Sequence, residues 1–269
     1  MTDPKLLIFG AGNMGGAMLA GWLVSGMDPA RITVVDPFLA SAPDGVRQLR
    51  EPPRGEAFDV VLLGFKPQQL GEAAPAIAPC VGPETLLLSI LAGVDLDTLG
   101  GYFPTAGGVV RVMPNLAAAL GKSPIGLFGR AGPGGKALVE HLMAPLGQAE
   151  WLSGEDRMDL ITALGGSGPA FVYRVIEALA AGAAELGLPR AQADRLALAM
   201  VEGAAALAAA SSVSPGELAD RVASPGGTTR AGLDVLDSDG RLAALMRDTL
   251  RAARDRSAEM TREAKKSNR

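Results

Sequence analysis

The sequence has very few of the residues that disulfide-rich proteins and many metal sites require. It contains one cysteine, Cys80, and one histidine, His141, among 269 residues. A single cysteine excludes an internal disulfide framework. One histidine and one cysteine are also too few for the His/Cys ligand sets typical of structural zinc. We therefore expect neither a disulfide nor a bound metal ion, with a metal site built from carboxylates alone left open as an alternative.

Aromatic residues and positive charge are scarce as well. Phe, Trp and Tyr make up 4% of the chain, whereas it contains 35 glycines. The formal net charge is −4 and the isoelectric point is near 5.2, so the chain has no excess of basic residues to attract nucleic acid. We expect helices packed closely through small residues, and no nucleic-acid partner.

The chain also lacks a hydrophobic run long enough to span a membrane. Residues 196–210 form its longest strongly apolar stretch, but Glu202 interrupts it. The stretch is shorter than the ~20 residues that a spanning helix needs. The first residues lack the apolar region of a signal peptide. We expect a soluble, cytoplasmic protein with no membrane partner.

The first half of the chain alternates short apolar runs with helical segments. The runs predicted to be buried parallel strands are 6–9, 32–35, 60–63, 86–90 and 109–112. The segments predicted to be helical are 14–25, 70–78 and 134–143. Residues 40–55 are rich in proline and glycine, which favours a loop or a short strand. This alternation predicts a doubly wound Rossmann-type α/β domain over residues 1–153.

The second half has no strand-like runs and should form an all-helical domain over residues 154–269. Its predicted helices are 157–164, 169–187, 190–210, 215–222 and 229–263. The helix at 169–187 is apolar on nearly every face, and such helices are normally buried. A helical domain of this size has too little interior to cover several such helices. We therefore predict that another subunit covers them.

A dinucleotide-binding fingerprint lies directly after the first predicted strand. Residues 10–15 read Gly-Ala-Gly-Asn-Met-Gly. Gly10 suits the tight turn, Gly12 lets a pyrophosphate approach the backbone, and Gly15 allows close packing of helix on strand. The alternative is a glycine-rich turn that binds nothing. The residues predicted to bind the cofactor are Gly10, Ala11, Gly12, Asn13, Met14, Gly15, Asp36, Phe65, Lys66 and Pro67.

Asp36 bears on the choice of nucleotide, because it ends the second predicted strand. A carboxylate at this position accepts hydrogen bonds from the adenosine ribose hydroxyls and repels a 2′-phosphate. The next residues, Pro37, Phe38 and Leu39, include no arginine to receive such a phosphate. The local residues therefore favour NADH.

Two further loops follow strands at the edge where ligands of open α/β sheets bind. Lys66 follows the strand at 60–63, and it is either a cofactor contact or an exposed loop lysine. Asn115 follows the strand at 109–112. It is either a substrate contact or the side chain of an Asx turn that closes its loop.

The segment 224–229, Ser-Pro-Gly-Gly-Thr-Thr, is typical of a site for a small anion. Gly226 and Gly227 allow close approach to the backbone, and Thr228 and Thr229 stand where a helix should begin. Unpaired amides at a helix N-terminus suit a carboxylate or a phosphate. The alternative is a glycine-rich turn followed by a threonine N-cap.

Six motifs, taken in order, resemble those of the pyrroline-5-carboxylate reductase family. They are Gly10-Ala-Gly-Asn-Met-Gly15, Phe65-Lys-Pro-Gln68, Arg111-Val-Met-Pro-Asn115, Gly166-Ser-Gly-Pro-Ala170, Gly187-Leu-Pro-Arg190 and Ser224-Pro-Gly-Gly-Thr-Thr229. The first motif is common to many dehydrogenases, whereas the fourth and the sixth are specific in combination. The resemblance covers the chain from residue 6 to about residue 260.

The resemblance implies a Rossmann domain followed by a helical domain that interlocks with a second subunit, often in a decamer of five dimers. It implies reduction of L-1-pyrroline-5-carboxylate to L-proline by NADPH or NADH, the last step of proline biosynthesis. It also implies that Thr229 hydrogen-bonds the ring nitrogen, while the backbone of Gly226, Gly227 and Thr228 holds the carboxylate. Relatives often have an Asn-Arg or similar pair, suited to NADP, where this chain has Asp36-Pro37.

Two other functions remain open from the sequence. The β-hydroxyacid dehydrogenases join similar domains, but they need a lysine where this chain has Val172. A redox sensor would bind a dinucleotide and report its state through a helical dimer. A sensor has no need of a second anion site such as residues 224–229.

Overall fold

The structure is a computed structural model that describes residues 3–267, with side chains described as far as Glu263. The chain divides into two compact units. The first unit comprises Met1–Gly166 together with Ala252–Arg269, and the second comprises Ser167–Arg251.

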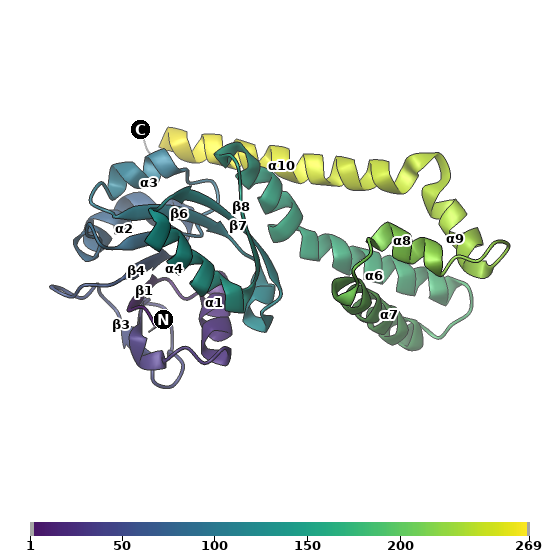
Figure 1. The fold of residues 1–269 in the computed structure, drawn as a ribbon, viewed down its shortest axis with the longest axis horizontal. Helices are drawn as coiled ribbons and strands as arrows, with labels where there is room; N and C mark the ends of the chain where they lie inside the picture. Colours follow the sequence, from purple (N-terminus) through teal and green to yellow (C-terminus); the bar gives the residue numbers. More distant parts are fainter. Residues whose placement is uncertain (1–2, 268–269) are drawn as a thin grey trace. The chain divides into compact units, whose positions relative to one another are not determined.

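An eight-stranded sheet forms the centre of the first unit (Figure 1). Its strands are β1 (Leu6–Phe9), β2 (Ile32–Val35), β3 (Arg47–Leu49), β4 (Val60–Leu63), β5 (Leu86–Ser89), β6 (Gly108–Met113), β7 (Ser123–Arg130) and β8 (Gly147–Trp151). Their order across the sheet is β3-β2-β1-β4-β5-β6-β7-β8. The Rossmann-type α/β fold predicted from the sequence is confirmed, and the proline-rich segment 40–55 contains the short strand β3.

Two strands were missed by the sequence analysis. In β7 the run of apolar residues is interrupted by Pro124, Gly126 and Gly129, and β8 alternates between more and less exposed side chains at the edge of the sheet. β7 is antiparallel to β6, whereas every other pair in the sheet is parallel. The connection from β6 to β7 is too short for the crossover that a parallel pair requires.

Helices cover both faces of the sheet. The helices of the first unit are α1 (Asn13–Val24), α2 (Leu70–Ile77), α3 (Leu96–Tyr102), α4 (Pro133–Met143) and α5 (Met158–Ile161). One buried cluster packs α1 and α4 on one face, and a second packs α2 and α3 on the other. Successive strand residues point to opposite faces, so Ile8 belongs to the first cluster and Leu7 to the second.

The second unit consists of helices. They are α6 (Gly168–Glu185), α7 (Arg190–Ala210), α8 (Pro215–Arg221), α9 (Thr228–Asp237) and the first part of α10 (Arg241–Ser267). The all-helical second half is confirmed, but the single helix predicted over 229–263 is wrong. The chain bends between α9 and α10 because Asp239 and Gly240 adopt left-handed backbone angles, with φ of 54° and 64°.

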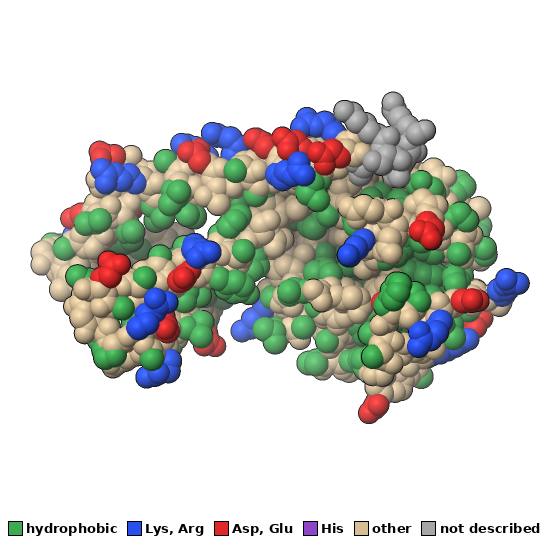
Figure 2. Space-filling model, turned by 180° about the vertical axis from the view of Figure 1, so that it is seen from behind, with side chains coloured by type: hydrophobic (Ala, Val, Ile, Leu, Met, Phe, Trp, Pro, Cys, Tyr) green, Lys and Arg blue, Asp and Glu red, His purple; other side chains and the backbone are tan. Residues whose placement is uncertain are grey.

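Hydrophobic side chains lie at the surface of the second unit. Its small core is built on three buried alanines, Ala180, Ala193 and Ala197. By contrast, Tyr173 on α6 is 68% exposed and Leu207 on α7 is 65% exposed. Hydrophobic side chains on these helices are visible in the space-filling view (Figure 2). The helices of this unit are therefore not covered by their own chain.

The boundary between the two units lies after Gly166, and not between residues 153 and 154 as the predicted domain boundary does. Residues 154–166 pack with the first unit, where Ile161 contacts Gly126 of β7. The end of α10 also belongs there, because Ser257 donates a 2.7 Å hydrogen bond to the carboxylate of Asp159. The functional division into a cofactor domain and a substrate domain stays a prediction.

Among the described residues, no single helix has both the length and the apolar character needed to cross a membrane. The helices α7 and α8 are long and apolar enough only when taken together, and the chain bends by 114° at the break between them.

Candidate cofactor and substrate sites

The turn between β1 and α1 is packed tightly by its glycines. Gly10 has a φ of +85°, and a Cβ at this position would lie 2.8 Å from the backbone nitrogen of Phe65. A Cβ on Gly15 would overlap the carbonyl oxygen of Gly10. A larger residue at Gly15 would push α1 away from the turn, and one at Gly10 would push the turn away from the loop after β4. The reasons given for these two glycines from the sequence agree with this geometry.

The N-terminus of α1 is open to an anion. Gly12 caps the helix without any side-chain hydrogen bond, and the first turn contains no acidic residue. No atom lies within 4 Å of the position of a Cβ on Gly12. The unpaired N–H groups of the first turn and the positive end of the helix dipole suit a pyrophosphate. The residues at this turn therefore fit the dinucleotide that the fingerprint predicts.

The remaining residues of the fingerprint differ in exposure. Asn13 is exposed, whereas Met14 is partly buried and packs against the cluster under α1 and α4. Ala11 is buried, and its backbone N–H donates a 2.9 Å hydrogen bond to the carboxylate of Asp36. The turn after β1 is thus joined directly to the end of β2.

Asp36 is surrounded by backbone donors. Its Oδ2 accepts from Ala11, and its Oδ1 accepts from the N–H groups of Phe38 at 2.9 Å and Leu39 at 3.2 Å. The carboxylate lies at the carboxyl end of β2, where the sequence predicts contact with the adenosine ribose. Both of its oxygens are already engaged by the protein.

The loop after β4 lies beside the glycine turn. Phe65 packs against the cluster under α2 and α3, and Lys66 is exposed. Pro67 begins a short 3₁₀ helix, Pro67–Gln69, at which the N–H of Lys66 bonds the side chain of Gln69 at 3.2 Å. The structure therefore brings this loop to the predicted cofactor edge. The contact of Lys66 with a cofactor stays a prediction.

Asn115 forms the Asx turn that the sequence left open as an alternative. Its Oδ1 accepts from the N–H of Ala117 at 2.9 Å, and its Nδ2 donates to the carbonyl of Gly165 at 2.8 Å. The residue is 7% exposed, and its own N–H bonds the hydroxyl of Ser123 at 2.8 Å. This geometry favours a structural role, and the predicted substrate contact is untested.

Asn115→Ala is expected to lower the free energy of unfolding by about 1–3 kcal/mol, because buried partners lose their hydrogen bonds. The groups left unpaired are the N–H of Ala117 and the carbonyl of Gly165. Urea denaturation measures the loss, and Lys122→Ala, an exposed position in the same connection, serves as the control. Unchanged stability with a KM for the substrate raised tenfold or more would instead support a substrate contact.

The sequence analysis did not assign a role to Arg111, which lies in the same motif as Asn115. Its side chain is 6% exposed, and its Nη1 lies 2.8 Å from Oε1 of Glu155. The same oxygen accepts the N–H of Leu96 at 2.9 Å. Arg111 and Asn115 therefore tie β6 and its loop to residues 155–165, which lead into the second unit.

The segment 224–229 forms a bare helix N-terminus in the second unit. Gly226 has a φ of +72°, and Gly227 caps α9 with no side-chain hydrogen bond. The first turn of α9 has no acidic residue. Thr228 and Thr229 occupy the first two positions of the helix, so the alternative in which a threonine serves as N-cap is wrong. Both threonines are exposed.

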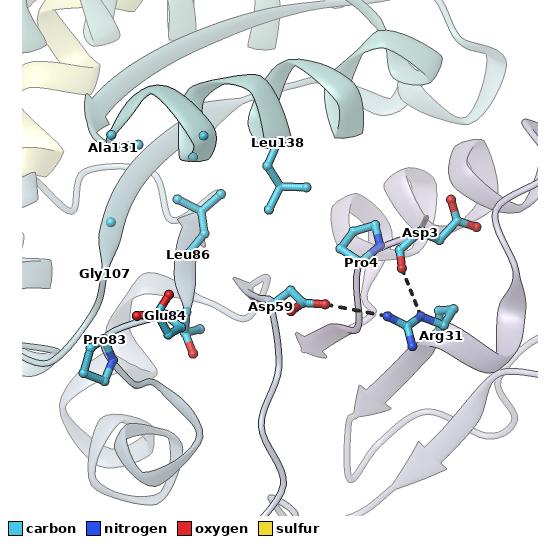
Figure 3. Close-up of a pocket in the computed structure, with 15 residues that line it drawn as sticks. Asp3, Pro4, Arg31, Asp59, Pro83, Glu84, Leu86, Gly107, Ala131 and Leu138 are labelled. Carbon is cyan, nitrogen blue, oxygen red and sulfur yellow. Dashed lines mark hydrogen bonds and ion pairs between the residues drawn. The ribbon is translucent and has the colours of Figure 1, made fainter. Parts of the chain in front are cut away.

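A cavity of about 460 Å³ lies at the opposite edge of the sheet, where β1, β4, β5 and β6 begin (Figure 3). Arg31 is paired with Asp59 at 3.7 Å and donates to the carbonyl of Asp3 at 3.0 Å. Glu84 also lines the cavity. Since the glycine turn and Asp36 lie at the carboxyl ends of the strands, this cavity is separate from the predicted cofactor site.

Comparison with known families and proteins gives matches over both halves of the chain. The family described as "Pyrroline-5-carboxylate reductase dimerisation" matches residues 155–260. The family described as "NADP oxidoreductase coenzyme F420-dependent" matches residues 5–93. The second match covers the glycine turn and Asp36, and the first covers residues 224–229.

Individual relatives match nearly the whole chain. The pyrroline-5-carboxylate reductase of Pseudomonas aeruginosa is 36% identical over 270 residues, which cover 97% of this chain and 98% of the relative. The enzyme of Methanosarcina acetivorans is 38% identical over 279 residues, covering 97% and 99%. A solved structure of a pyrroline-5-carboxylate reductase from Coxiella burnetii has a TM-score of 0.88 and 32% identity, covering 96% of this chain and 98% of that one. The chain belongs to the pyrroline-5-carboxylate reductase family.

Proposed function

We propose that this protein is an NAD(P)H-dependent oxidoreductase that reduces the C=N bond of L-1-pyrroline-5-carboxylate to give L-proline, the last step of proline biosynthesis. Its membership of the family supports this activity. The observation that carries the proposal is the N-terminus of α9, where the hydroxyls of Thr228 and Thr229 are open to a small carboxylate, as are the backbone N–H groups other than that of Gly227, which bonds the carbonyl of Ser224 at 2.9 Å.

The first unit would bind the cofactor at the carboxyl edge of its sheet. The N–H groups at the start of α1 would hold the pyrophosphate, since Gly12 leaves the backbone accessible. Asp36 lies where an adenosine ribose is expected. When bound, the reduced nicotinamide supplies the hydride.

The second unit would hold the substrate. The amides of Gly226 and Thr228 would bind the carboxylate, joined by that of Gly227 once its 2.9 Å bond to the carbonyl of Ser224 is released. The hydroxyl of Thr229 would hydrogen-bond the ring nitrogen. A protonated cyclic imine is already electrophilic at its C=N carbon, C2 of the pyrroline ring, so the chain has no need of a strong catalytic base. Its one histidine, His141, lies on α4 of the first unit, exposed at the surface.

A second copy of the chain would cover the exposed hydrophobic side chains of the second unit. The match of residues 155–260 to a dimerisation family supports this assignment. We propose a homodimer at least, and a decamer of five dimers as the resemblance implies. The molecular mass of the protein in solution tests the proposed dimer and the proposed decamer. The cytoplasmic location stays a prediction.

The reaction is tested by mixing the purified protein with L-1-pyrroline-5-carboxylate and NADH or NADPH. We expect nicotinamide absorbance to fall and proline to form in equal amount. Binding of a dinucleotide without turnover would contradict the proposal and support the redox sensor. Oxidation of a β-hydroxyacid in place of imine reduction would support the dehydrogenase alternative, although Val172 stands where that class needs lysine.

A further inference from the structure

An arginine distant from Asp36 in the sequence lies beside the end of β2. The parallel register of β2 and β3 pairs Val35 with Leu49, and the N–H of Asp36 donates to the carbonyl of Leu49 at 3.1 Å. Arg50 is the residue that directly follows the edge strand β3. Its Nη1 donates a 2.6 Å hydrogen bond to the carbonyl of Pro37. The guanidinium therefore stands at the loop that the sequence analysis found to contain no arginine.

Among the residues that the structure describes, Arg50 has no ion pair with an acidic side chain. Arg47, on the same strand, contacts both carboxylate oxygens of Glu56 at 2.9 and 2.8 Å. Its hydrogen bond lowers the pKa of Glu56. Arg50 is exposed, and within the described part of the chain its recorded partner is the neutral carbonyl of Pro37. A guanidinium in this state retains donors for an incoming anion.

The carboxylate of Asp36 should repel a 2′-phosphate less strongly than the sequence alone suggests. Its two oxygens accept three backbone hydrogen bonds, from Ala11, Phe38 and Leu39. Hydrogen bonds from dipoles such as these offset part of the negative charge. The carboxylate is thus directed at the protein backbone, while Arg50 faces solvent.

The loop after β2 is also braced. The side chain of Gln48 on β3 donates to the carbonyl of Leu39 at 2.8 Å and accepts from the N–H of Ala42 at 2.7 Å. β3 therefore supports the loop through Gln48 and adds a cation through Arg50. Together they form a prepared surface next to the position of the adenosine ribose.

We propose that Arg50 binds the 2′-phosphate of NADPH and is the residue that determines nucleotide specificity in this protein. The inference rests on the proposed function, since it concerns the cofactor of that reaction. It reverses the preference for NADH argued from Asp36 and its neighbours in sequence. The guanidinium forms charge-assisted hydrogen bonds to the phosphate, which the 2′-hydroxyl of NADH does not offer.

The test measures the binding of the two cofactors directly, without relying on turnover of the substrate. Calorimetric titration gives Kd for NADPH and for NADH with the full-length protein, with Arg50→Ala and with Arg50→Lys. The control is Arg130→Ala, which removes the same charge from the end of β7, where that antiparallel strand reaches the opposite edge of the sheet.

We expect Arg50→Ala to raise Kd for NADPH by about 10- to 100-fold, the range for loss of a hydrogen bond to a charged group. Kd for NADH should stay within about threefold, and Arg50→Lys should lie between Arg50→Ala and the unaltered protein. An unchanged Kd for NADPH would overturn the inference. Equal weakening of both cofactors would also overturn it, because Arg50 would then serve only to hold the loop through Pro37.

Cofactor binding and turnover by the unaltered protein test the proposed function separately from the inference about Arg50. If it binds a dinucleotide and turns over L-1-pyrroline-5-carboxylate while Arg50→Ala has no selective effect, only the inference fails. If it binds neither NADPH nor NADH, the proposed function fails with it.

Discussion

Thr229→Ala is expected to lower kcat for the imine by about 10- to 1000-fold, the range for loss of one catalytic hydrogen-bonding group. Thr229 is the second residue of α9, and its side chain is exposed. We assign its hydroxyl to the ring nitrogen, whose orientation decides whether hydride reaches the C=N carbon of the ring. Because the hydroxyl makes no recorded hydrogen bond within the described chain, its removal should not disturb the fold.

Steady-state kinetics of three proteins measure the role of Thr229. Thr229→Ser retains the hydroxyl and should recover most of kcat, whereas Thr229→Ala should not. Thermal unfolding of both variants should match that of the unaltered protein. A kcat for Thr229→Ala within twofold of normal would remove Thr229 from the reaction and leave only the backbone of residues 226–228 as the substrate site.

Gly12→Ala is expected to weaken dinucleotide binding without weakening the fold. Its Cβ would meet no protein atom within 4 Å, and the backbone at Gly12, with φ of −65°, suits alanine. The added methyl group would instead meet the pyrophosphate. A steric penalty of about 1–3 kcal/mol corresponds to a Kd raised roughly 5- to 150-fold. Calorimetric titration with NADH and NADPH measures this change.

Gly15→Ala is the matched variant, because the same methyl group at Gly15 meets the backbone of Gly10. Overpacking costs about 1–3 kcal/mol, and alanine recovers roughly 0.5–1 kcal/mol over glycine in a helix, so we expect a net loss of up to about 2.5 kcal/mol in the free energy of unfolding. Gly12→Ala should change that free energy by less than about 1 kcal/mol. Equal stability losses in the two variants would contradict this division of roles.

The sequence predicted correctly those strands and turns that depend on a single local pattern of residues. The continuous apolar runs that became β1, β2 and β4 were placed correctly, since strands buried on both faces carry such runs. The glycine spacing at 10–15 predicted the turn because Gly10 and Gly15 leave no room for a Cβ, while Gly12 leaves the backbone accessible. Gly226 and Gly227 likewise predicted a helix start at which no side chain caps the backbone. The N-cap residue of α9 is Gly227 itself.

The sequence was a poor guide where the local signal is weak. β7 and β8 were missed because their proline, glycine and polar residues break the apolar pattern, and neighbouring strands supply the hydrogen bonds that hold them. The break at Asp239 was missed because the helical pattern continues on both sides of it. Asn115 was recognised as a candidate, but its bond to Gly165 depends on a residue 50 positions further along the chain.

The sequence by itself determined the strands and helices that have strong local patterns, the two glycine-rich helix starts and the family to which the chain is similar, because each depends on residues close together along the chain. Only the tertiary structure decided that Asn115 is committed to Gly165, that Arg111 pairs with Glu155 and that Arg50 reaches Pro37. These contacts join residues 13 to 50 positions apart. They arise from strand register and loop packing, which no local pattern of side chains encodes.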